Sequence, residues 1–418
     1  MKTYKNVKPK KKQKNKKKTR KPNNKGRGVK KTQLKTNEPR NLFTIDQFTD
    51  FDSVISHETK RIGNGNNGII WSIPFRVTYN YTSYAVLKCN ALTDKDGGIN
   101  TNDDNYADNL YYEYFVGKHF INKYVKKFPC FVETYDCYTL SPDKWNDLMT
   151  KTSNIELNTG IRKYSGDFST SCTNSIYLSV LIQHFDSNQF YSLYNEIDNM
   201  MVEIPFICYQ ILFVLCSLGD SYTHYDLHLN NVFCYKPYDD KRYIRMNYHK
   251  KDGSIISFPT QYIMKIIDYG RNYFNNGTKN TNDILQTEIC NNPKCQPECG
   301  LNFGYSIIQG HVLGENEYKT TPDKPNSSND LKFMRDIIMT YLHNRYGILF
   351  TYDGDQYENG YPHRIQTIYD AQKVMEDIIR KDPTILMRLK YDEYFDWEQA
   401  AEMNIYEDGR DFEYINLL

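Results

Sequence analysis

The sequence lacks both an apolar segment long enough to cross a bilayer and the apolar core of a secretory signal. Its longest apolar run, Ile204–Leu218, has 15 residues and includes Pro205 and Gln210, whereas a membrane-spanning helix needs about 20 residues. Lysines rather than apolar residues follow Met1, so we expect no signal peptide. These absences predict a soluble intracellular protein without membrane contact. Its ten cysteines are then free thiols or metal ligands rather than a disulfide framework.

Acidic residues are nearly absent from residues 1–40, which contain 18 Lys and Arg but only one acid, Glu38. The whole chain has 53 Lys and Arg and 51 Asp and Glu, so residues 41–418 keep 35 basic and 50 acidic side chains, a net charge of −15. A segment so basic and so poor in apolar residues repels itself and cannot compensate the entropy lost on folding. We therefore expect a disordered basic tail, residues 1–40, attached to an acidic folded body.

The tail also lacks aromatic residues except Tyr4. Without aromatic side chains on which bases can stack, we do not expect it to read a nucleotide sequence. Its charge predicts a non-specific, salt-dependent contact with nucleic acid, or a nuclear import signal. A tail that only improves solubility is the alternative.

Strand patterns dominate the first half of the body and helix patterns the second, and no internal repeat is visible. Residues 143–175 show no clear pattern. Runs of β-branched and aromatic residues predict strands over 61–90, 131–140, 176–182 and 264–267. Apolar periodicity predicts helices over 110–126, 188–201, 204–218, 335–346 and 369–380. This order is typical of an α+β fold with two lobes.

Glycines recur between the first two expected strands, as Gly63, Gly65 and Gly68 in a GxGxxG pattern. Glycine lets the backbone approach a phosphate closely and offer its N–H groups to it. In a dinucleotide-binding fold this pattern opens into a helix, but here the strand-like sequence IIWSIPF follows. The context therefore favours a glycine flap over nucleotide phosphates.

Two charged residues come next along the chain. Lys88 ends the apolar strand AVLK, and Glu113 lies on the next expected helix. A lysine at the end of a buried strand needs a partner, and an ion pair with Glu113 would direct its ammonium toward phosphates. An exposed lysine and an unrelated surface glutamate are the alternative.

Two polar loops complete the set. Asp226 and Asn231 lie in HYDLHLNN after the buried helix, and Asp268 lies in DYG after the strand MKII. This spacing suits a carboxylate that accepts a hydrogen bond from the substrate hydroxyl and an amide that reaches a metal, while Asp268 supplies the hard oxygen ligand that Mg²⁺ prefers. We expect all these segments to meet around one triphosphate, which requires Lys88 and Asp268 to share a cleft.

In this order the motifs resemble those of the eukaryotic-type protein kinase superfamily, over about residues 55–345. The D-L-H-x-x-N loop is similar to that of haspin-like kinases, and also to small-molecule phosphotransferases of the aminoglycoside and choline kinase type. The sequences HYDLHLNN and IIDYGR resemble kinase-like proteins of large DNA viruses. The resemblance implies a lobe of residues 41–185, with an antiparallel sheet and one helix, and a mostly helical lobe of residues 186–418.

The resemblance also implies ATP and Mg²⁺ as cofactors and a role for each motif residue. The phosphate flap would consist of Gly63, Gly65 and Gly68. Lys88 would bind the α- and β-phosphates and pair with Glu113. Asp226 would be the catalytic base, and the metal ligands would be Asn231 and Asp268.

Further positions take their expected roles from the same resemblance. Gln183, His184 and Phe185 would offer backbone groups to adenine, with Ile182 at the back of the pocket. Asp330 would hold the catalytic loop from below. The expected activity is transfer of the γ-phosphoryl group to Ser or Thr of a protein. The acidic body favours a basic substrate.

Several positions depart from the family pattern. Tyr225 replaces the arginine that receives an activation-loop phosphate, Tyr269 replaces phenylalanine, and no APE motif follows Asp268. Residues 236–261 must form an insertion, which we expect to be a hairpin. A pseudokinase that binds nucleotide or a partner, and a small-molecule phosphotransferase, are the alternative functions.

A last feature is Cys290, Cys295 and Cys299, with His311 as the nearest fourth ligand for zinc. The first spacing is wider than usual for a zinc site and no second pair follows. Three reduced thiols are therefore the preferred interpretation.

Overall fold

The computed structural model describes residues 48–65, 68–90, 109–164, 177–185, 187–189, 200–238, 242–284, 324–334, 337–350, 364–383, 385 and 400–415. The chain divides into two units, residues 1–36 and 37–418, and every described residue belongs to the second. The basic tail lies outside the described residues, as do Cys290, Cys295, Cys299 and His311. The hypotheses about them stay predictions.

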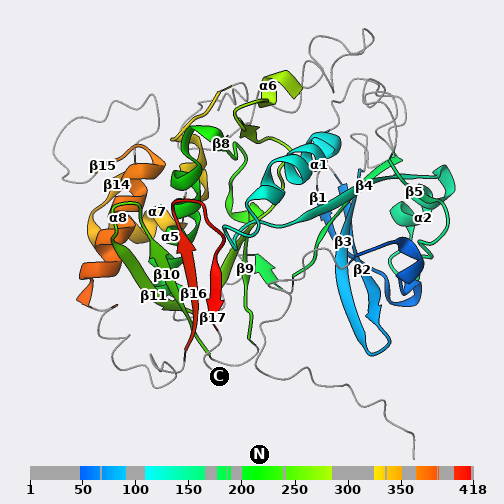
Figure 1. Ribbon diagram of the computed structural model, residues 1–418, viewed down its shortest axis with the longest axis horizontal. Coiled ribbons are helices and arrows are strands. Elements are labelled where there is room, and N and C mark those ends of the chain that lie inside the picture. The colour runs from blue at the N-terminus through cyan, green and yellow to red at the C-terminus, as the bar shows by residue number, and fades with distance from the viewer. Residues whose placement is uncertain are drawn as a thin grey trace, which may run out of the picture. The chain divides into compact units, whose positions relative to one another are not determined.

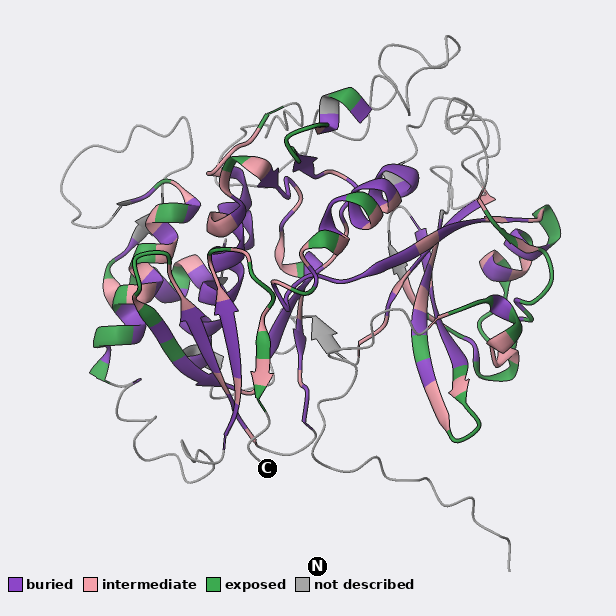
Figure 2. Ribbon diagram, viewed as in Figure 1, coloured by how far each residue is buried: buried purple, intermediate pink, exposed green. Residues whose placement is uncertain are grey.

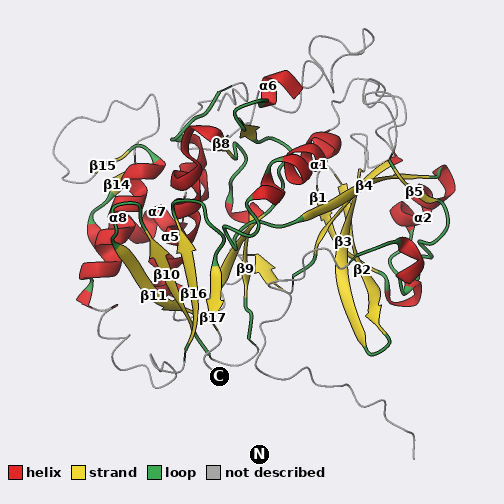
Figure 3. Cartoon of the chain, in the orientation of Figure 1, coloured by secondary structure: helices red, strands yellow, loops and turns green. Residues whose placement is uncertain are grey.

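A six-stranded antiparallel sheet forms from the first part of the body, with strand order β1-β2-β3-β6-β4-β5 (Figures 1 and 3). Its strands are β1 (Lys60–Gly65), β2 (Gly68–Thr78), β3 (Tyr81–Asn90), β4 (Thr134–Leu140), β5 (Ile161–Lys163) and β6 (Leu178–Gln183). Side chains alternate between the two faces of a strand. Leu181 of β6 therefore joins one hydrophobic cluster with Trp71, while Val180 joins a second cluster that includes helix α1 (Asn109–His119). The sheet separates two cores.

Helix α1 packs closely on β4 because residue 117 is glycine. A Cβ atom at Gly117 would lie 2.1 Å from the side-chain oxygen of Thr134, well inside van der Waals contact. Any side chain there would push the helix away from the strand. Gly117 therefore helps to fix the position of Glu113, one turn earlier on the same helix.

Helix α5 (Met200–Leu218) forms the centre of the second core (Figure 2). It is apolar on all sides, which is typical of a helix surrounded by other elements. The expectation that no segment is long enough to cross a membrane is wrong by length and composition alone, because the helical window Glu203–Ser221 has 19 residues, but 72% of that window is buried within the fold. This burial is consistent with the expected soluble protein.

Two short strands of this core position the polar loops. Strand β9 (Val232–Tyr235) pairs antiparallel with β12 (Ile263–Ile266), so that Val232 lies opposite Ile266. The end of the loop before β9 therefore meets the start of the loop after β12. Further elements are the short strands β7 (Ser187–Gln189), β8 (Tyr222–Thr223), β13 (Tyr273–Phe274), β14 (Leu349–Phe350) and β15 (Arg364–Ile365), and the helices α6 (Thr281–Ile284), α7 (Ile337–Tyr346) and α8 (Ile368–Lys381).

The expected insertion is a hairpin of β10 (Ile244–His249) and β11 (Ile255–Thr260). Strand β10 also pairs in parallel with β16 (Ala401–Tyr406), which in turn pairs with β17 (Glu413–Ile415). Side chains join the two distant segments, because Arg245 contacts Glu402 at 2.6 Å and Asn247 donates to Asn404 at 3.1 Å. The far end of the chain thus completes the sheet that the insertion begins.

The structure confirms a mixed α+β class with an antiparallel sheet and several helices. The expected helix at residues 188–201 is wrong at its start, because Ser187–Gln189 forms a strand that pairs with β9, and such pairing overrides local propensity. Residues 190–199 lie outside the described part. The second half also contains more strand than expected, since β16 and β17 join the insertion there.

The segment 143–175 contains a helix that the sequence pattern did not indicate. Helix α2 spans Pro142–Thr150, and the side chain of Ser141 accepts a hydrogen bond from the N–H of Lys144. A serine cap followed by proline at the first helical position is a common helix start. The helix buries Trp145 and Leu148 against the sheet.

Candidate active site

Lys88 lies at the centre of a charge cluster that joins three parts of the chain. Its Nζ donates to Oε2 of Glu113, on α1, at 2.5 Å and to Oδ1 of Asp268 at 3.2 Å. Asp268 follows β12 by two residues and is 180 positions away from Lys88 in the sequence. The expected ion pair and the expected meeting of Lys88 with Asp268 are both present. The alternative of an exposed lysine and a surface glutamate is wrong, because Glu113 is buried.

The cluster contains one cation and two carboxylates, and its burial shifts each pKa. Burial raises the pKa of Glu113 to about 7, against the attraction of Lys88. Burial also opposes ionisation of Asp268, but Lys88 and then His224 outweigh it and hold the pKa of that carboxyl below its usual range. Burial likewise favours the neutral amine of Lys88, but Asp268 and Glu113 together raise its pKa above the usual value. At neutral pH an ionised Asp268 therefore lies beside a charged lysine.

A buried carboxylate holds the loop 224–231, which carries Asp226. The two oxygens of Asp330 accept the backbone N–H groups of His224 at 2.7 Å and Tyr225 at 2.9 Å. Tyr225 has a left-handed φ of 62°, which is costly for a residue with a Cβ atom. The two hydrogen bonds offset this cost. Asp330 thus anchors the loop, as the resemblance implies.

Three basic side chains lie close to the carboxylate of Asp226 in this loop. The distances to its carboxylate are 3.8 Å from His228 Nε2, 3.7 Å from Arg271 Nε and 3.8 Å from Lys332 Nζ. These exceed hydrogen-bond length, so within the described ranges no side chain donates a hydrogen bond to the carboxylate. A carboxylate with free acceptor positions near cations can take a proton from a hydroxyl group.

Asn231 and Asp268 lie on adjoining loops. The Asn231 amide donates to the backbone oxygen of Asp226 at 2.9 Å, and the N–H of Ile267 donates to the backbone oxygen of Asn231 at 3.1 Å. Among the residues that the structure describes, no group of three His, Cys, Asp or Glu could enclose a metal. Mg²⁺ does not need one, because it usually keeps several waters and binds one or two carboxylates and the substrate phosphates. The amide oxygen of Asn231 and the partly exposed carboxylate of Asp268 fit such a site.

The glycine motif lies on the hairpin next to the strand of Lys88. Gly65 pairs with Gly68, and residues 66 and 67 between them lie outside the described part. A Cβ atom on Gly68 would lie 2.6 Å from the backbone oxygen of Cys89, so β2 can begin this close to β3 only with glycine. A Cβ atom on Gly63 would make ordinary contact at 3.4 Å, so packing does not require glycine there. Contact of the motif with phosphate stays a prediction.

The three expected adenine-binding residues follow one another at the end of β6. The N–H of Gln183 already donates to the backbone oxygen of Glu133 at 2.8 Å, so this N–H is not available to a base. Phe185 packs edge-on against Phe233 of β9 at 6.0 Å. The ring of His184 lies 5.4 Å from that of Tyr84, on β3. Their contact with adenine stays a prediction.

His224 joins the loop 224–231 to the segment before Asp268. Its Nε2 lies 3.0 Å from the carbonyl of Ile267 and must donate to it, since a carbonyl only accepts. Within the described residues its Nδ1 is buried without a hydrogen-bond partner. Burial lowers the pKa of His224 to about 4, against the attraction of Asp226. The ring is therefore neutral at physiological pH.

We expect His224 to make the folded state less stable as the pH falls from 6.5 to 4. In this range the unfolded chain binds a proton that the folded chain excludes, so stability is lost with acidification. The change in pKa corresponds to at most about 3 kcal/mol. Urea denaturation at pH 7.5, 5.5 and 4.5 should show a steeper loss for the wild type than for His224→Gln, whose amide can also donate to Ile267. Equal slopes would contradict the prediction.

The motifs did not identify the two permanent cations beside Asp226. Arg271 directly follows Asp268-Tyr269-Gly270, and Lys332 follows Asp330 by two residues. Their only signal in the sequence is this nearness to motif residues. Which of the 53 Lys and Arg side chains faces Asp226 depends on the fold.

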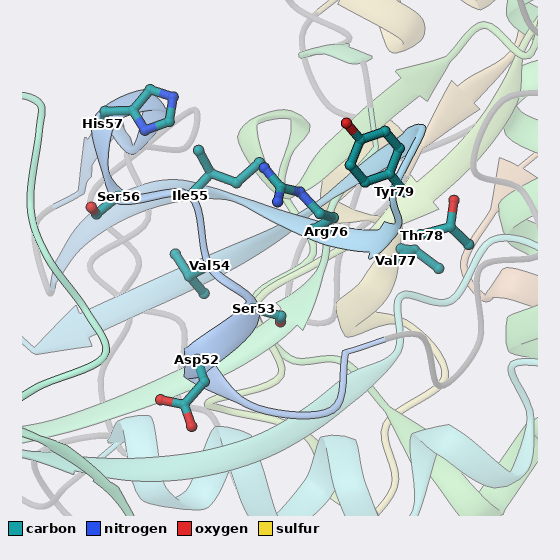
Figure 4. A pocket seen from close by; sticks show the side chains of 10 residues that line it. All are labelled: Asp52, Ser53, Val54, Ile55, Ser56, His57, Arg76, Val77, Thr78 and Tyr79. Atoms are coloured by element: carbon teal, nitrogen blue, oxygen red, sulfur yellow. The ribbon is translucent and has the colours of Figure 1, made fainter.

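An open hollow of about 580 Å³ lies elsewhere, beside the outer end of β2 (Figure 4). Arg76 and Tyr79 line one side of it, and Asp52 and His57 lie on the segment that precedes β1. None of the predicted site residues lines this hollow. It is therefore separate from the Lys88 cluster.

The case for a function rests on the arrangement of these side chains. No protein-family model matches the chain, and no curated protein matches its sequence.

Proposed function

We propose that this chain is an ATP- and Mg²⁺-dependent protein kinase that transfers the γ-phosphoryl group to a Ser or Thr hydroxyl. The observation that carries the proposal is the double contact of Lys88 with Glu113 and Asp268. A lysine, a glutamate and an aspartate could meet by chance. They would not then also belong to motifs that follow one another along the chain in the order that the family uses. In this proposal residues 41–185 and 186–418 are the two lobes of a kinase-like fold.

Lys88 would bind the phosphates from the side of the six-stranded sheet. Its ammonium is held by Glu113, so little side-chain entropy remains to be lost when phosphate binds. Gly68 brings the start of β2 against the end of β3, which would place the glycine hairpin over the same phosphates. Preorganised charge of this kind accounts for most of the catalysis of phosphoryl transfer.

Asp226 would act on the acceptor. The hydroxyl oxygen forms a bond to the γ-phosphorus while the bond from that phosphorus to the β,γ-bridging oxygen breaks. ADP leaves with the electron pair, and the hydroxyl proton passes to Asp226. Asp330 and Asn231 hold the backbone around Asp226 through the bonds described above, which keeps the carboxylate in place.

Asn231 and Asp268 would hold Mg²⁺ through their oxygen atoms. When bound, the metal would neutralise charge on the triphosphate and order its oxygens. The ammonium of Lys88 keeps the Asp268 carboxylate ionised, and that is the form a metal requires. The complete set of Lys88, Glu113, Asp226, Asn231 and Asp268 favours an active enzyme over a pseudokinase.

Transfer of label from [γ-³²P]ATP tests the proposal directly. Purified full-length protein should label a basic protein in the presence of Mg²⁺ and lose this activity with EDTA. An acidic protein and a mixture of hydroxylated metabolites complete the panel. Label found only in a metabolite would point to a small-molecule phosphotransferase. Nucleotide binding without any transfer would point to a pseudokinase.

A further inference from the structure

The backbone at Asp268 is strained. Its φ of 67° lies in the left-handed region, which is costly for a residue with a Cβ atom. This conformation sets the direction in which the carboxylate leaves the chain, and in the structure the carboxylate contacts Lys88. A strained residue keeps its conformation only where its surroundings hold it. The contacts on either side of Asp268 therefore decide whether its carboxylate stays in place.

The residue before Asp268 is held by two hydrogen bonds. The N–H of Ile267 donates to the backbone oxygen of Asn231 at 3.1 Å, and the carbonyl of Ile267 accepts from Nε2 of His224 at 3.0 Å. Both polar backbone groups of Ile267 are thus paired, which fixes the chain where it enters Asp268.

The residue after Asp268 is held by its side chain. The Tyr269 hydroxyl accepts the N–H of Val132 at 2.9 Å, and it lies 2.9 Å from the backbone oxygen of Ile266 and 3.3 Å from that of Val132. The hydroxyl has one proton, which it donates to one of these two oxygens. Tyr269 is 3% exposed, so little water can compete for these bonds.

The hydroxyl joins two segments that the backbone already brings together. Residues 130–132 lie in the connection from α1 to β4, and there the backbone oxygen of Cys130 accepts the N–H of Ile266 at 2.8 Å. Tyr269 extends this pairing beyond the end of β12. The loop of Asp268 is thereby tied to the segment that follows α1.

Phenylalanine, which the family pattern has at this position, could keep the packing but not the bonds. The ring of Tyr269 lies edge-on to that of Phe131 at 6.4 Å, and a phenyl ring fits the same space. Val132 is buried, however, and without the hydroxyl its N–H would lose this acceptor. A buried N–H without an acceptor is costly, so arrangements in which the loop is released would become more populated. The bonds are a property of this chain and not of the family pattern.

We propose that Tyr269 is a positioning residue for the metal: its hydroxyl holds Asp268 in the conformation in which the carboxylate can bind Mg²⁺. The inference rests on the proposed function, because it takes Asp268 as a metal ligand. When the loop is released the carboxylate turns away, so the metal binds only those molecules in which the loop is held. The apparent affinity for the metal then falls in proportion to the fraction of such molecules.

Calorimetric titration of ADP into the full-length protein, once with excess Mg²⁺ and once with EDTA, tests this inference. The ratio of the two affinities measures how much the metal strengthens nucleotide binding. In Tyr269→Phe this ratio should fall by about threefold or more, because the hydrogen bonds that oppose release are gone. The affinity in EDTA should change less than about twofold, because no metal is bound there.

Tyr209→Phe is the matched control. It removes another buried hydroxyl, which belongs to α5 and donates to Glu376 of α8 at 3.2 Å. This variant should lose stability but keep the wild-type ratio. A hydroxyl that only stabilises the fold changes the number of folded molecules that bind ADP and leaves the ratio of affinities unchanged.

Hydrogen–deuterium exchange of residues 129–133 gives a second measurement, which stays decisive if Tyr269→Phe does not fold. In the wild type, Mg²⁺ and ADP together should slow exchange of the Val132 amide, because they favour the molecules in which the loop is held. ADP with EDTA should not slow it. Equal exchange in these two conditions would contradict the inference.

A ratio that falls by less than about threefold in Tyr269→Phe, or that falls equally in Tyr209→Phe, would overturn the positioning role and leave the kinase proposal intact. If Mg²⁺ does not strengthen ADP binding to the wild type, the proposed function fails and the positioning role fails with it. A fall confined to Tyr269→Phe would support the role.

Discussion

Replacing Asp226 with asparagine is expected to reduce the rate of phosphoryl transfer by about 10²- to 10⁴-fold, which is the usual contribution of a general base. Asparagine has the same shape but takes up no proton. The folded state should change little, because Asp226 is not the anchor of its loop. That function belongs to Asp330, which binds the backbone of His224 and Tyr225.

Steady-state rates with the labelled-ATP assay, together with the affinity for ADP, check this prediction. Asp220→Asn is a suitable control because Asp220 is exposed and lies just before the same loop. It should keep the wild-type rate. If Asp226→Asn kept more than about a tenth of the wild-type rate, its assignment as the base would have to be abandoned.

Replacing Lys88 with methionine is expected to remove measurable transfer and also to destabilise the fold. The variant leaves the buried carboxylate of Glu113 without its cation, and breaking a buried ion pair from one side costs about 3 kcal/mol or more. The loss of folding stability should increase between pH 6 and pH 8. Without Lys88 the pKa of Glu113 rises above its present value of about 7, and the folded chain must then retain a proton that the unfolded chain releases.

The double variant Lys88→Met with Glu113→Leu separates the two effects. Replacing both charged residues by apolar ones should return most of the stability measured by urea denaturation. Transfer should stay absent, because the phosphates have lost their ammonium. If Lys88→Met alone were as stable as the wild type, the ion pair of Lys88 and Glu113 would contribute nothing to the free energy of unfolding. Activity in the double variant would show that Lys88 does not serve the nucleotide.

The sequence could predict the parts of the site that depend on local pattern. Lys88 lies near the end of one apolar strand and Asp268 follows another by two residues, and such strands are easy to recognise from their residues. Their meeting across 180 positions was predictable only because the motifs occurred in a known order. Physical pattern alone left the surface alternative open for Lys88 and Glu113.

The sequence could not predict the contacts that depend on tertiary structure. Lys332 carries no pattern of its own, and it lies near Asp226 because its turn, Asn329–Met334, is joined to the loop 224–231 by the two backbone N–H groups that Asp330 accepts. Strand β16 has the sequence AEMNIY, whose mixed polarity did not predict a strand. It becomes one because β10 offers a row of backbone partners. From the sequence Gly117 is only a poor helix former. In the structure the lack of a side chain at this position leaves room for the side chain of Thr134.

The parallel pairing of β10 with β16 has a consequence for the order of folding during synthesis. The ribosome produces β10 long before its partner strand, because Arg245 precedes Glu402, which pairs with it, by 157 positions. Until then one side of the hairpin is an open edge, which is a surface that other chains can join. A newly made chain would thus pass through a period in which chaperones or a nascent neighbour compete for the position that β16 finally takes.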